Sequence, residues 1–205
     1  MKKISKDFKY GNNLILGHDV IIEEDVQVGD NVKLGHRATL KSGTIIGDNT
    51  IFDDHCISTG ACYIGNNVNI RTGAIISKAT IIEDYAFIGP GVITNHTKNV
   101  NHGRKDKIKE IQLLTYVGYG SVLGSQASIL AGVTIAPLSI VGGGTVVVKN
   151  ITEEGVYVGF PASKKMALPE EYYMELPKNA GCMYLKQEIL NHLKKYMPAL
   201  LLPEI

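Results

Sequence analysis

A hydrophobic residue recurs at every sixth position along most of this chain. Between residues 16 and 88 there are thirteen such positions, and Ser58 is the only polar residue among them. The members of this series are Leu16, Ile22, Val28, Leu34, Leu40, Ile46, Phe52, Ser58, Ile64, Ile70, Ile76, Ile82 and Ile88. The phase breaks after Ile93, and six further hexads follow at Val117, Leu123, Ile129, Ile135, Val141 and Val147. Four positions after each member stands a small or β-branched residue, and none of these is charged.

This period predicts a β-solenoid. Six residues are too few for a helix pair or an ordinary hairpin, but they fit a short strand and a turn, and Gly, Asn and Asp commonly follow the aliphatic residue. If three such sides close one coil, a coil has about 18 residues, so residues 16–93 supply about four coils and residues 117–152 supply two. We expect an all-β solenoid with inward-facing aliphatic side chains and a loop, residues 94–116, extruded from it.

Residues 18 apart should then form columns along the outside of the prism. One column consists of Asn12, Asp30, Asp48, Asn66 and Asp84, which are all turn-forming residues. A second column consists of His18, His36 and Asp54. Two histidines and an aspartate are metal-binding types, but solvent-facing turn residues are the interpretation we favour.

Composition divides the chain near Ala162. Residues 1–162 hold 38 of the 40 Ile and Val residues and 21 of the 22 Gly residues, as strands and tight turns require. Residues 163–205 form a separate extension, in which Leu185, Ile189, Leu193 and Met197 recur at helical spacing before Pro198. We expect this C-terminal helix to cap the open last coil or to pack on a neighbouring subunit, with His192 exposed to solvent.

Charge and cysteine content exclude several classes of partner. The chain carries 21 Lys and Arg against 20 Asp and Glu, which gives no broad basic field for nucleic acid. No apolar run is long enough to span a membrane, and no secretion signal is recognisable, so we expect a cytoplasmic protein. Cys56 and Cys62 occupy the small inward position of their hexads, which predicts buried thiols without a catalytic role.

The repeat resembles that of the hexapeptide-repeat acyltransferases over residues 16–164. Three further segments strengthen the resemblance: IGPGV at 88–92 before the loop, SILAGVTIAPLSIVGGGTVVVKNI at 128–151, and VGFPA at 158–162, where Phe160 stands in place of the family's usual Asn. The resemblance implies a left-handed parallel β-helix, a homotrimer, acetyl-CoA as cosubstrate and no metal. It is greatest to enzymes that acetylate a hydroxyl or amino group of a sugar or nucleotide-sugar.

The extruded loop contains the candidate catalytic residues. It carries His96, His102 and a basic run, and imidazole has the pKa that a general base needs near neutral pH. By resemblance, this loop brings a histidine to the thioester, and His96 best matches that position. His102 is the competing base. Neither histidine would be needed if the acceptor were an amine, which attacks unaided once neutral, but Arg71-Thr72-Gly73 departs from the paired Asn of such N-acetyltransferases.

The resemblance also places coenzyme A along the later coils and at the closing turn. The positions that it implies for cofactor binding are Gly124, Ala131, Gly142, Lys149, Pro161 and Lys164. Two alternatives remain. A γ-carbonic-anhydrase-like zinc enzyme shares the solenoid but needs three metal-binding histidines, and a non-catalytic solenoid can serve as a binding scaffold.

Overall fold

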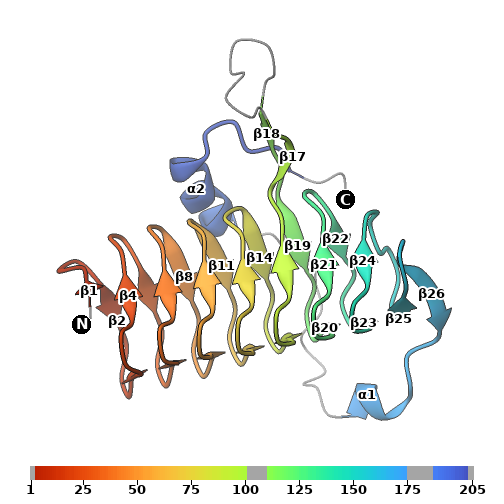
Figure 1. Ribbon diagram of the computed structural model, residues 1–205, viewed down its shortest axis with the longest axis horizontal. Helices are drawn as coiled ribbons and strands as arrows, with labels where there is room; N and C mark the ends of the chain where they lie inside the picture. Colours follow the sequence, from red (N-terminus) through yellow and green to blue (C-terminus); the bar gives the residue numbers. More distant parts are fainter. Residues whose placement is uncertain (1–2, 101–109, 175–186, 203–205) are drawn as a thin grey trace.

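The computed structural model is a parallel β-helix whose coils follow one another from the N-terminus (Figure 1). The structure describes residues 3–100, 110–174 and 187–202. Within these ranges three sheets form the sides of the helix, and strands of successive coils pair in parallel. We name the sheets after their first strands. The β-solenoid predicted from the hexads is confirmed, and it is consistent with the left-handed parallel β-helix that the resemblance implies.

The strands of each sheet are short and alternate along the chain. The β1 sheet contains β1 (Lys3–Ile4), β4 (Ile21–Ile22), β7 (Thr39–Leu40), β10 (Ile57–Ser58), β13 (Ile75–Ile76), β16 (Ile93–Thr94), β21 (Ser128–Ile129) and β24 (Val146–Val147). The β2 sheet contains β2 (Lys9–Tyr10), β5 (Gln27–Val28), β8 (Thr44–Ile46), β11 (Cys62–Ile64), β14 (Thr80–Ile82), β19 (Thr115–Val117) and β22 (Thr134–Ile135). The β3 sheet contains β3 (Ile15–Leu16), β6 (Lys33–Leu34), β9 (Ile51–Phe52), β12 (Asn69–Ile70), β15 (Phe87–Ile88), β20 (Val122–Leu123), β23 (Ser139–Val141), β25 (Gly155–Val158) and the antiparallel β26 (Ser163–Met166).

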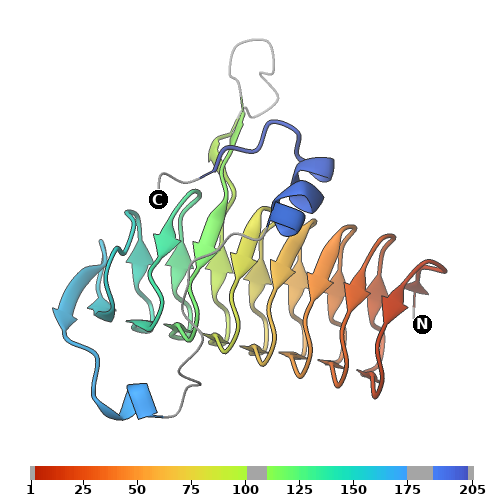
Figure 2. The ribbon, with the colours of Figure 1, turned by 180° about the vertical axis from the view of Figure 1, so that it is seen from behind.

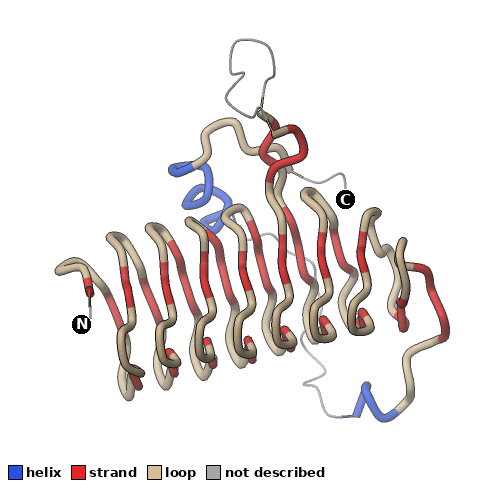
Figure 3. Tube along the Cα trace, viewed as in Figure 1, coloured by secondary structure: helices blue, strands red, loops and turns tan. Residues whose placement is uncertain are grey.

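The pairing register confirms the 18-residue coil. Ile57 pairs with Thr39 on one side and with Ile75 on the other, each 18 residues away. The loop does not disturb this stack, because Thr80 pairs directly with Thr115 across it. The tube trace in Figure 3 shows the same regular coils on both sides of the loop. The loop is therefore an insertion between two coils that lie in contact.

The solenoid begins earlier than the hexads from Leu16 predicted. β1 and β2 form a further coil side by side with β4 and β5. Ile4 and Tyr10 continue the six-residue phase, but Tyr10 is 63% exposed because no coil covers it. A hollow of about 610 Å³ marks this open end of the helix, lined by residues that include Phe8, Tyr10 and Leu14.

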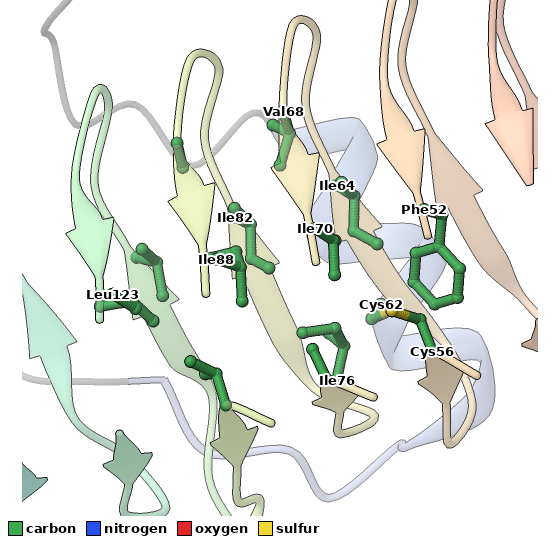
Figure 4. Close-up of a cluster of buried hydrophobic side chains, with 14 of the residues drawn as sticks. Phe52, Cys56, Cys62, Ile64, Val68, Ile70, Ile76, Ile82, Ile88 and Leu123 are labelled. Atoms are coloured by element: carbon green, nitrogen blue, oxygen red, sulfur yellow. The ribbon is translucent and has the colours of Figure 1, made fainter. Parts of the chain in front are cut away.

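Inward aliphatic side chains form the core, as predicted (Figure 4). Phe52, Ile64, Ile70, Ile76 and Ile88 are each fully buried. The one polar member of the series, Ser58, is also buried; its hydroxyl accepts a hydrogen bond from the Lys41 N–H (3.0 Å) and lies 2.7 Å from Thr44 Oγ1. A satisfied hydroxyl is tolerated in such a core.

The polar columns at the turns are hydrogen-bonded ladders. In the first column, each backbone N–H donates to the side chain of the next coil, as when Asp48 N–H donates to Asn66 Oδ1 (2.8 Å) and Asn66 N–H to Asp84 Oδ1 (2.7 Å). The left-handed backbone conformation falls one residue later, at Asn49 and Asn67. Each of these side chains therefore satisfies a backbone N–H of the neighbouring coil.

Replacing Asn66 with alanine should lower the free energy of unfolding by about 1 kcal/mol, because the Asp48 N–H loses its acceptor. The amide of Asn66 also donates to Asp84 Oδ2 (3.2 Å), a weaker contact. Urea denaturation followed by circular dichroism measures the change. Lys33→Ala, which removes an exposed side chain outside the polar columns, is the control; a loss in Lys33→Ala as large as in Asn66→Ala would contradict the ladder explanation.

The C-terminal helix exists as predicted but covers a different surface. After β26 and the short α1 (Glu171–Met174), α2 (Gln187–Tyr196) lies beside β8, β11 and β14 on the flank of the solenoid, as Figures 1 and 2 show from opposite sides. Its buried residues and two residues that follow it form a second apolar cluster with the flank of the solenoid. The helix and its continuation contribute Ile189, Leu190, Leu193, Met197 and Leu200, and the solenoid contributes Ala61, Ala79, Ile81, Leu114 and Tyr116. The expectation that it caps the last coil is wrong, because the outward face of the β2 sheet is apolar here. No helix in the described ranges is long and apolar enough to cross a membrane.

Small residues make room for this helix. Gly43 has a positive φ of 78°, and a Cβ there would lie 2.6 Å from the Tyr196 ring. His192 Nε2 lies 2.7 Å from the Gly43 carbonyl oxygen, so this side chain is half-buried and our prediction of an exposed His192 is wrong. Lys195 Nζ lies 2.6 Å from Asp25 Oδ2, which the Tyr196 hydroxyl also contacts.

Candidate active site at the base of the loop

The loop leaves the solenoid at the edge between the β1 sheet and the β2 sheet, which we call the loop edge (turns at 23–26, 41–43 and 77–79). It departs after β16 and returns at β19, and its two arms pair as β17 (Thr97–Asn99) and β18 (Ile111–Gln112). The Leu113 N–H donates to the His96 carbonyl oxygen (2.8 Å), and Thr115 Oγ1 donates to the Asn95 carbonyl oxygen (2.7 Å). The backbone of His96 is therefore held at the base of the loop.

The C-terminal segment adds a third strand-like contact to this base. The Leu201 N–H donates to the Gln112 carbonyl oxygen (3.1 Å), and the Leu114 N–H donates to the Leu201 carbonyl oxygen (3.0 Å). Leu113 and Leu201 form a parallel bridge. The returning arm of the loop thus lies between the outgoing arm, which contains His96, and the tail that follows α2.

His96 has the surroundings of a neutral base. Its side chain is half-buried, and this burial lowers the pKa of the imidazole below its ordinary value. The charge of Lys78 lowers the pKa further, and Glu110 opposes both effects. A neutral imidazole is the form that accepts a proton. The side chain of His96 makes no hydrogen bond to any residue in the described part of the chain.

A hollow opens at the base of the loop, on the side of the later coils, and is lined by the residues on either side of His96 but not by His96 itself. It has a volume of about 520 Å³. Its lining consists of Asn95, Thr97, Lys98, Leu113, Leu130, Ala131, Gly132 and Val148. Residues on both sides of His96 in the sequence thus contact the same space as Ala131, one of the predicted coenzyme A positions. Its lining combines the polar side chains of Asn95, Thr97 and Lys98 with the aliphatic side chains of Leu113, Leu130 and Val148.

The other predicted coenzyme A positions divide between two edges of the solenoid. Lys149 is exposed and follows Val148 of the hollow, so it lies on the loop edge with Ala131. Gly124 and Gly142 lie on the edge between the β3 sheet and the β1 sheet, and Pro161 lies in the turn between β25 and β26. Lys164 lies at the end of the helix, where its Nζ is 3.0 Å from Glu153 Oε1.

Close packing explains why positions 124 and 142 are occupied by glycine. A Cβ at Gly124 would lie 2.5 Å from the backbone nitrogen of Gly143, and a Cβ at Gly142 would lie 2.8 Å from Val158 Cγ1. These distances are too short for any side chain. The structure therefore places Ala131 in the same hollow as Asn95 and Thr97 and places Lys149 on the same edge, whereas Gly124 and Gly142 allow close stacking of the coils.

The remaining candidates from the sequence are turn or core residues, or lie outside the described ranges. His18 and His36 have stacked rings 5.0 Å apart; the His18 N–H donates to His36 Nδ1 (2.9 Å), and the His36 N–H donates to Asp54 Oδ1 (2.6 Å), which is the ladder geometry of the other columns. His102 and the basic run at 104–109 lie outside the described residues.

Among the described residues, neither the cysteines nor the side chains that could bind a metal ion form a second candidate site. Cys56 and Cys62 are buried, as predicted, and burial raises the pKa of their thiols to about 11 and about 12. A thiol with such a pKa is a poor nucleophile. Among residues 3–100, 110–174 and 187–202, no three His, Cys, Asp or Glu side chains come together as a metal ion would require.

Lys78 and Glu110 were missed by the sequence reasoning. Lys78 lies in the turn directly before the coil that carries the loop, and the signal was its position 18 residues before His96 in the same column. Glu110 precedes β18, and the signal was the antiparallel pairing of the loop arms, which places Thr97 Oγ1 3.3 Å from Glu110 Oε1.

The chain is similar in sequence to a curated acetyltransferase. No family model matches the chain. The serine acetyltransferase of Buchnera aphidicola subsp. Acyrthosiphon pisum is 28% identical over 124 residues, which cover 58% of this chain and 42% of that enzyme. The match therefore spans less than half the length of this curated relative.

Solved structures share the fold. The UDP-N-acetylglucosamine acyltransferase from Campylobacter jejuni has a TM-score of 0.57 and 17% identity, covering 95% of this chain and 81% of that one. AntD, an N-acyltransferase from Bacillus cereus, in complex with dTDP-4-amino-4,6-dideoxyglucose and coenzyme A, has a TM-score of 0.53 and 18% identity, covering 82% and 88%. These similarities confirm the resemblance in fold to the hexapeptide-repeat acyltransferases.

Proposed function

We propose that this chain, which has the solenoid of the hexapeptide-repeat acyltransferases, transfers an acetyl group from acetyl-CoA to a hydroxyl or amino group of a sugar or nucleotide-sugar. The observation that carries the proposal is the placement of His96. Its half-buried imidazole, which makes no hydrogen bond to another described residue, lies at the base of the loop, where the adjacent residues Asn95 and Thr97 line a hollow that reaches the later coils. The curated serine acetyltransferase and the fold neighbours point to the same chemistry.

In this mechanism His96 acts as the general base. The acceptor oxygen or nitrogen attacks the thioester carbonyl carbon, and His96 takes the proton that the acceptor loses. The carbon–sulfur bond then breaks, and coenzyme A leaves as a thiolate. Positioned proton removal contributes about 10²- to 10⁴-fold to such a rate. Burial and Lys78 keep the imidazole neutral and therefore ready to accept the proton.

Coenzyme A is proposed to enter from the side of the later coils. In this proposal the thioester occupies the hollow at Ala131, whose lining includes the neighbours of His96 in the sequence, and Lys149 follows on the same edge. The other positions carried by resemblance, Gly124, Gly142, Pro161 and Lys164, remain predictions. AntD, which shares the fold, is solved in complex with coenzyme A, which supports the choice of cosubstrate.

A homotrimer is part of the proposal. The outward face of the β2 sheet is covered by α2 of the same chain, which leaves the β1 and β3 sheets for contacts between subunits. Both carry exposed apolar residues, such as Ile21 and Ile93 on the β1 sheet and Phe87 on the β3 sheet. Light scattering tests the assembly, and a monomer at assay concentration would contradict it.

The pH dependence of the reaction should report the state of His96. Because burial and Lys78 lower the pKa of His96, kcat/KM should rise with pH and level off, with its inflection below the ordinary imidazole value near 6.5. The value of kcat/KM rises with pH because His96 acts as a base, and a protonated imidazole cannot accept a proton. Initial rates between about pH 5 and pH 8 measure the inflection, and one at or above 6.5 would contradict these surroundings.

Thiol release from acetyl-CoA tests the function directly. The purified chain is assayed with a panel of amino and hydroxy sugars and nucleotide-sugars, and the acetylated product is identified by mass spectrometry. We expect acceptor-dependent release of one thiol per acetyl group transferred. If no acceptor of the panel supports release, the acetyltransferase proposal fails; stoichiometric bound zinc would then favour the zinc-enzyme alternative, and its absence the binding scaffold.

A further inference from the structure

Two basic side chains at the base of the loop have no partner in the described ranges. Lys78 is half-buried, and no carboxylate of the described residues lies within ion-pair distance of its Nζ. The ring of His96 is equally unpaired. By contrast, Lys41, two coils earlier on the same edge, is paired with Glu23 (3.3 Å). A partly buried charge without a partner costs free energy, and a bound anion removes that cost.

Hydrogen bonds fix Lys78 between the two points where the loop leaves and rejoins the solenoid. On one side of it, Ser77 donates from its N–H to Thr94 Oγ1 (2.9 Å) and from its hydroxyl to the Thr94 carbonyl oxygen (2.6 Å). On the other side, the Ala79 carbonyl oxygen accepts from the Thr115 N–H (2.9 Å). Lys78 therefore lies directly beneath the loop base, where its charge reaches the His96 imidazole.

The base of the loop divides the loop edge into two sides. The hollow at Ala131 and Val148 lies on the side of the later coils. Lys78 lies on the side of the earlier coils, and its own N–H donates to Thr59 Oγ1 (3.0 Å) of the coil before. If the thioester enters from the later coils, the earlier side is left for the acceptor, because the two substrates must meet at His96.

We propose that Lys78 binds an anionic group of the acceptor, a carboxylate or a phosphate, beside the hydroxyl or amine from which His96 removes the proton. This inference rests on the proposed acetyl transfer and narrows the acceptor to an acidic sugar or a sugar phosphate, nucleotide-sugars included. Of the other charged groups near His96, Lys98 is exposed in the hollow on the opposite side, and Glu110 is engaged by Thr97. Neither can replace Lys78 on the acceptor side.

Matched acceptors test the inference kinetically. Glucuronic acid against glucose, and glucosamine 6-phosphate against glucosamine, differ only in the anionic group. We expect the charged member of a pair to be acetylated in preference, and Lys78→Gln to raise its KM at least about tenfold while the KM for acetyl-CoA stays unchanged. Lys33→Gln, which removes an exposed lysine of the β3 sheet, is the matched control. Equal KM values for the charged acceptors in the two variants would overturn the inference, as would a rise in the KM for acetyl-CoA alone.

Anion binding without turnover gives a second, independent readout. Inorganic phosphate is titrated into the protein while the His96 imidazole is followed by NMR. We expect a saturable shift of the His96 signals in the wild type and in Lys33→Gln, and its loss in Lys78→Gln. If thiol release fails with every acceptor but this shift persists, the proposed function falls and the anion site stands. If acetyl transfer proceeds and Lys78→Gln changes neither readout, only the anion site falls.

Discussion

Replacing His96 with alanine should lower kcat for acetyl transfer by about 10²- to 10⁴-fold, the usual contribution of a positioned base. The KM for acetyl-CoA should change little, because the imidazole acts on the acceptor proton and the hollow is lined by other residues. Steady-state thiol release measures both constants. Added imidazole should restore part of the lost rate, which a merely structural histidine would not allow.

The controls separate the base from the fold and from the competing histidine. His18→Ala removes an exposed histidine whose ring only stacks on His36, and it should retain full activity. An unchanged circular dichroism spectrum shows that His96→Ala is folded. Undiminished activity in His96→Ala would overturn the assignment; if His102→Ala then lost activity, the base would be the other histidine of the loop, and if neither lost activity, the acceptor would be an amine that needs no base.

The architecture could be predicted because its determinants are local. Each inward residue from Leu16 to Val147 is specified by its own hexad, and parallel stacking repeats the same contact in every coil. The loop could be located for the same reason, since a break in a strict repeat is visible without any tertiary information. His96 followed from the loop, because it lies just after the break. The first coil was also predictable, because Ile4 and Tyr10 keep the six-residue spacing, but Tyr10 is not an aliphatic residue of the kind that marks the other hexads.

The docking of the tail could not be predicted, because it depends on contacts between distant residues. Lys195 and Tyr196 contact Asp25, about 170 positions away, and no local pattern specifies that pairing. A weak signal existed in the column Gly43, Ala61 and Ala79, where small residues replace the Asn and Asp of the other edges. Small residues at exposed turns indicate a surface that another element covers. The helix was therefore predictable, but its partner surface was not.

The surroundings of His96 depend both on the local sequence and on contacts between residues that are distant in the sequence. Its position in the loop is local, but its half-burial and its neighbour Lys78 arise only when β14 and β19 close the gap beneath the loop. The same closure creates the hollow at Ala131 and the division of the loop edge into two sides. A sequence can thus indicate a candidate base, whereas the burial and the charge around that residue come from the coils stacked on either side of it.

Replacing Leu201 with proline should lower kcat at least about tenfold with little change in the melting temperature. The substitution removes the N–H that donates to the Gln112 carbonyl oxygen, and with it one of the two hydrogen bonds that tie the tail to the returning arm of the loop. That arm in turn holds His96 through the Leu113 N–H, so its displacement moves the base. A shift of about 1 Å in a catalytic group can cost about a hundredfold in rate, whereas α2 keeps its own buried face and its contacts with Asp25. Thiol release measures kcat, and hydrogen exchange at Leu113 and Leu114 measures the loosening of the loop base.

Leu202→Pro is the matched control for this role of the tail. Its side chain is 39% exposed, and its N–H makes no backbone hydrogen bond to a residue of the described ranges, so it introduces the same ring without removing a bond of the loop base. It should leave kcat and the exchange rates near those of the wild type. If Leu201→Pro speeds exchange at Leu113 and Leu114 but leaves kcat intact, the tail stabilises the loop without positioning His96. If both variants lose activity equally, the effect belongs to the ring and not to the Leu201–Gln112 bond. Only a loss of kcat confined to Leu201→Pro, together with faster exchange, assigns the tail a part in holding the base at the thioester.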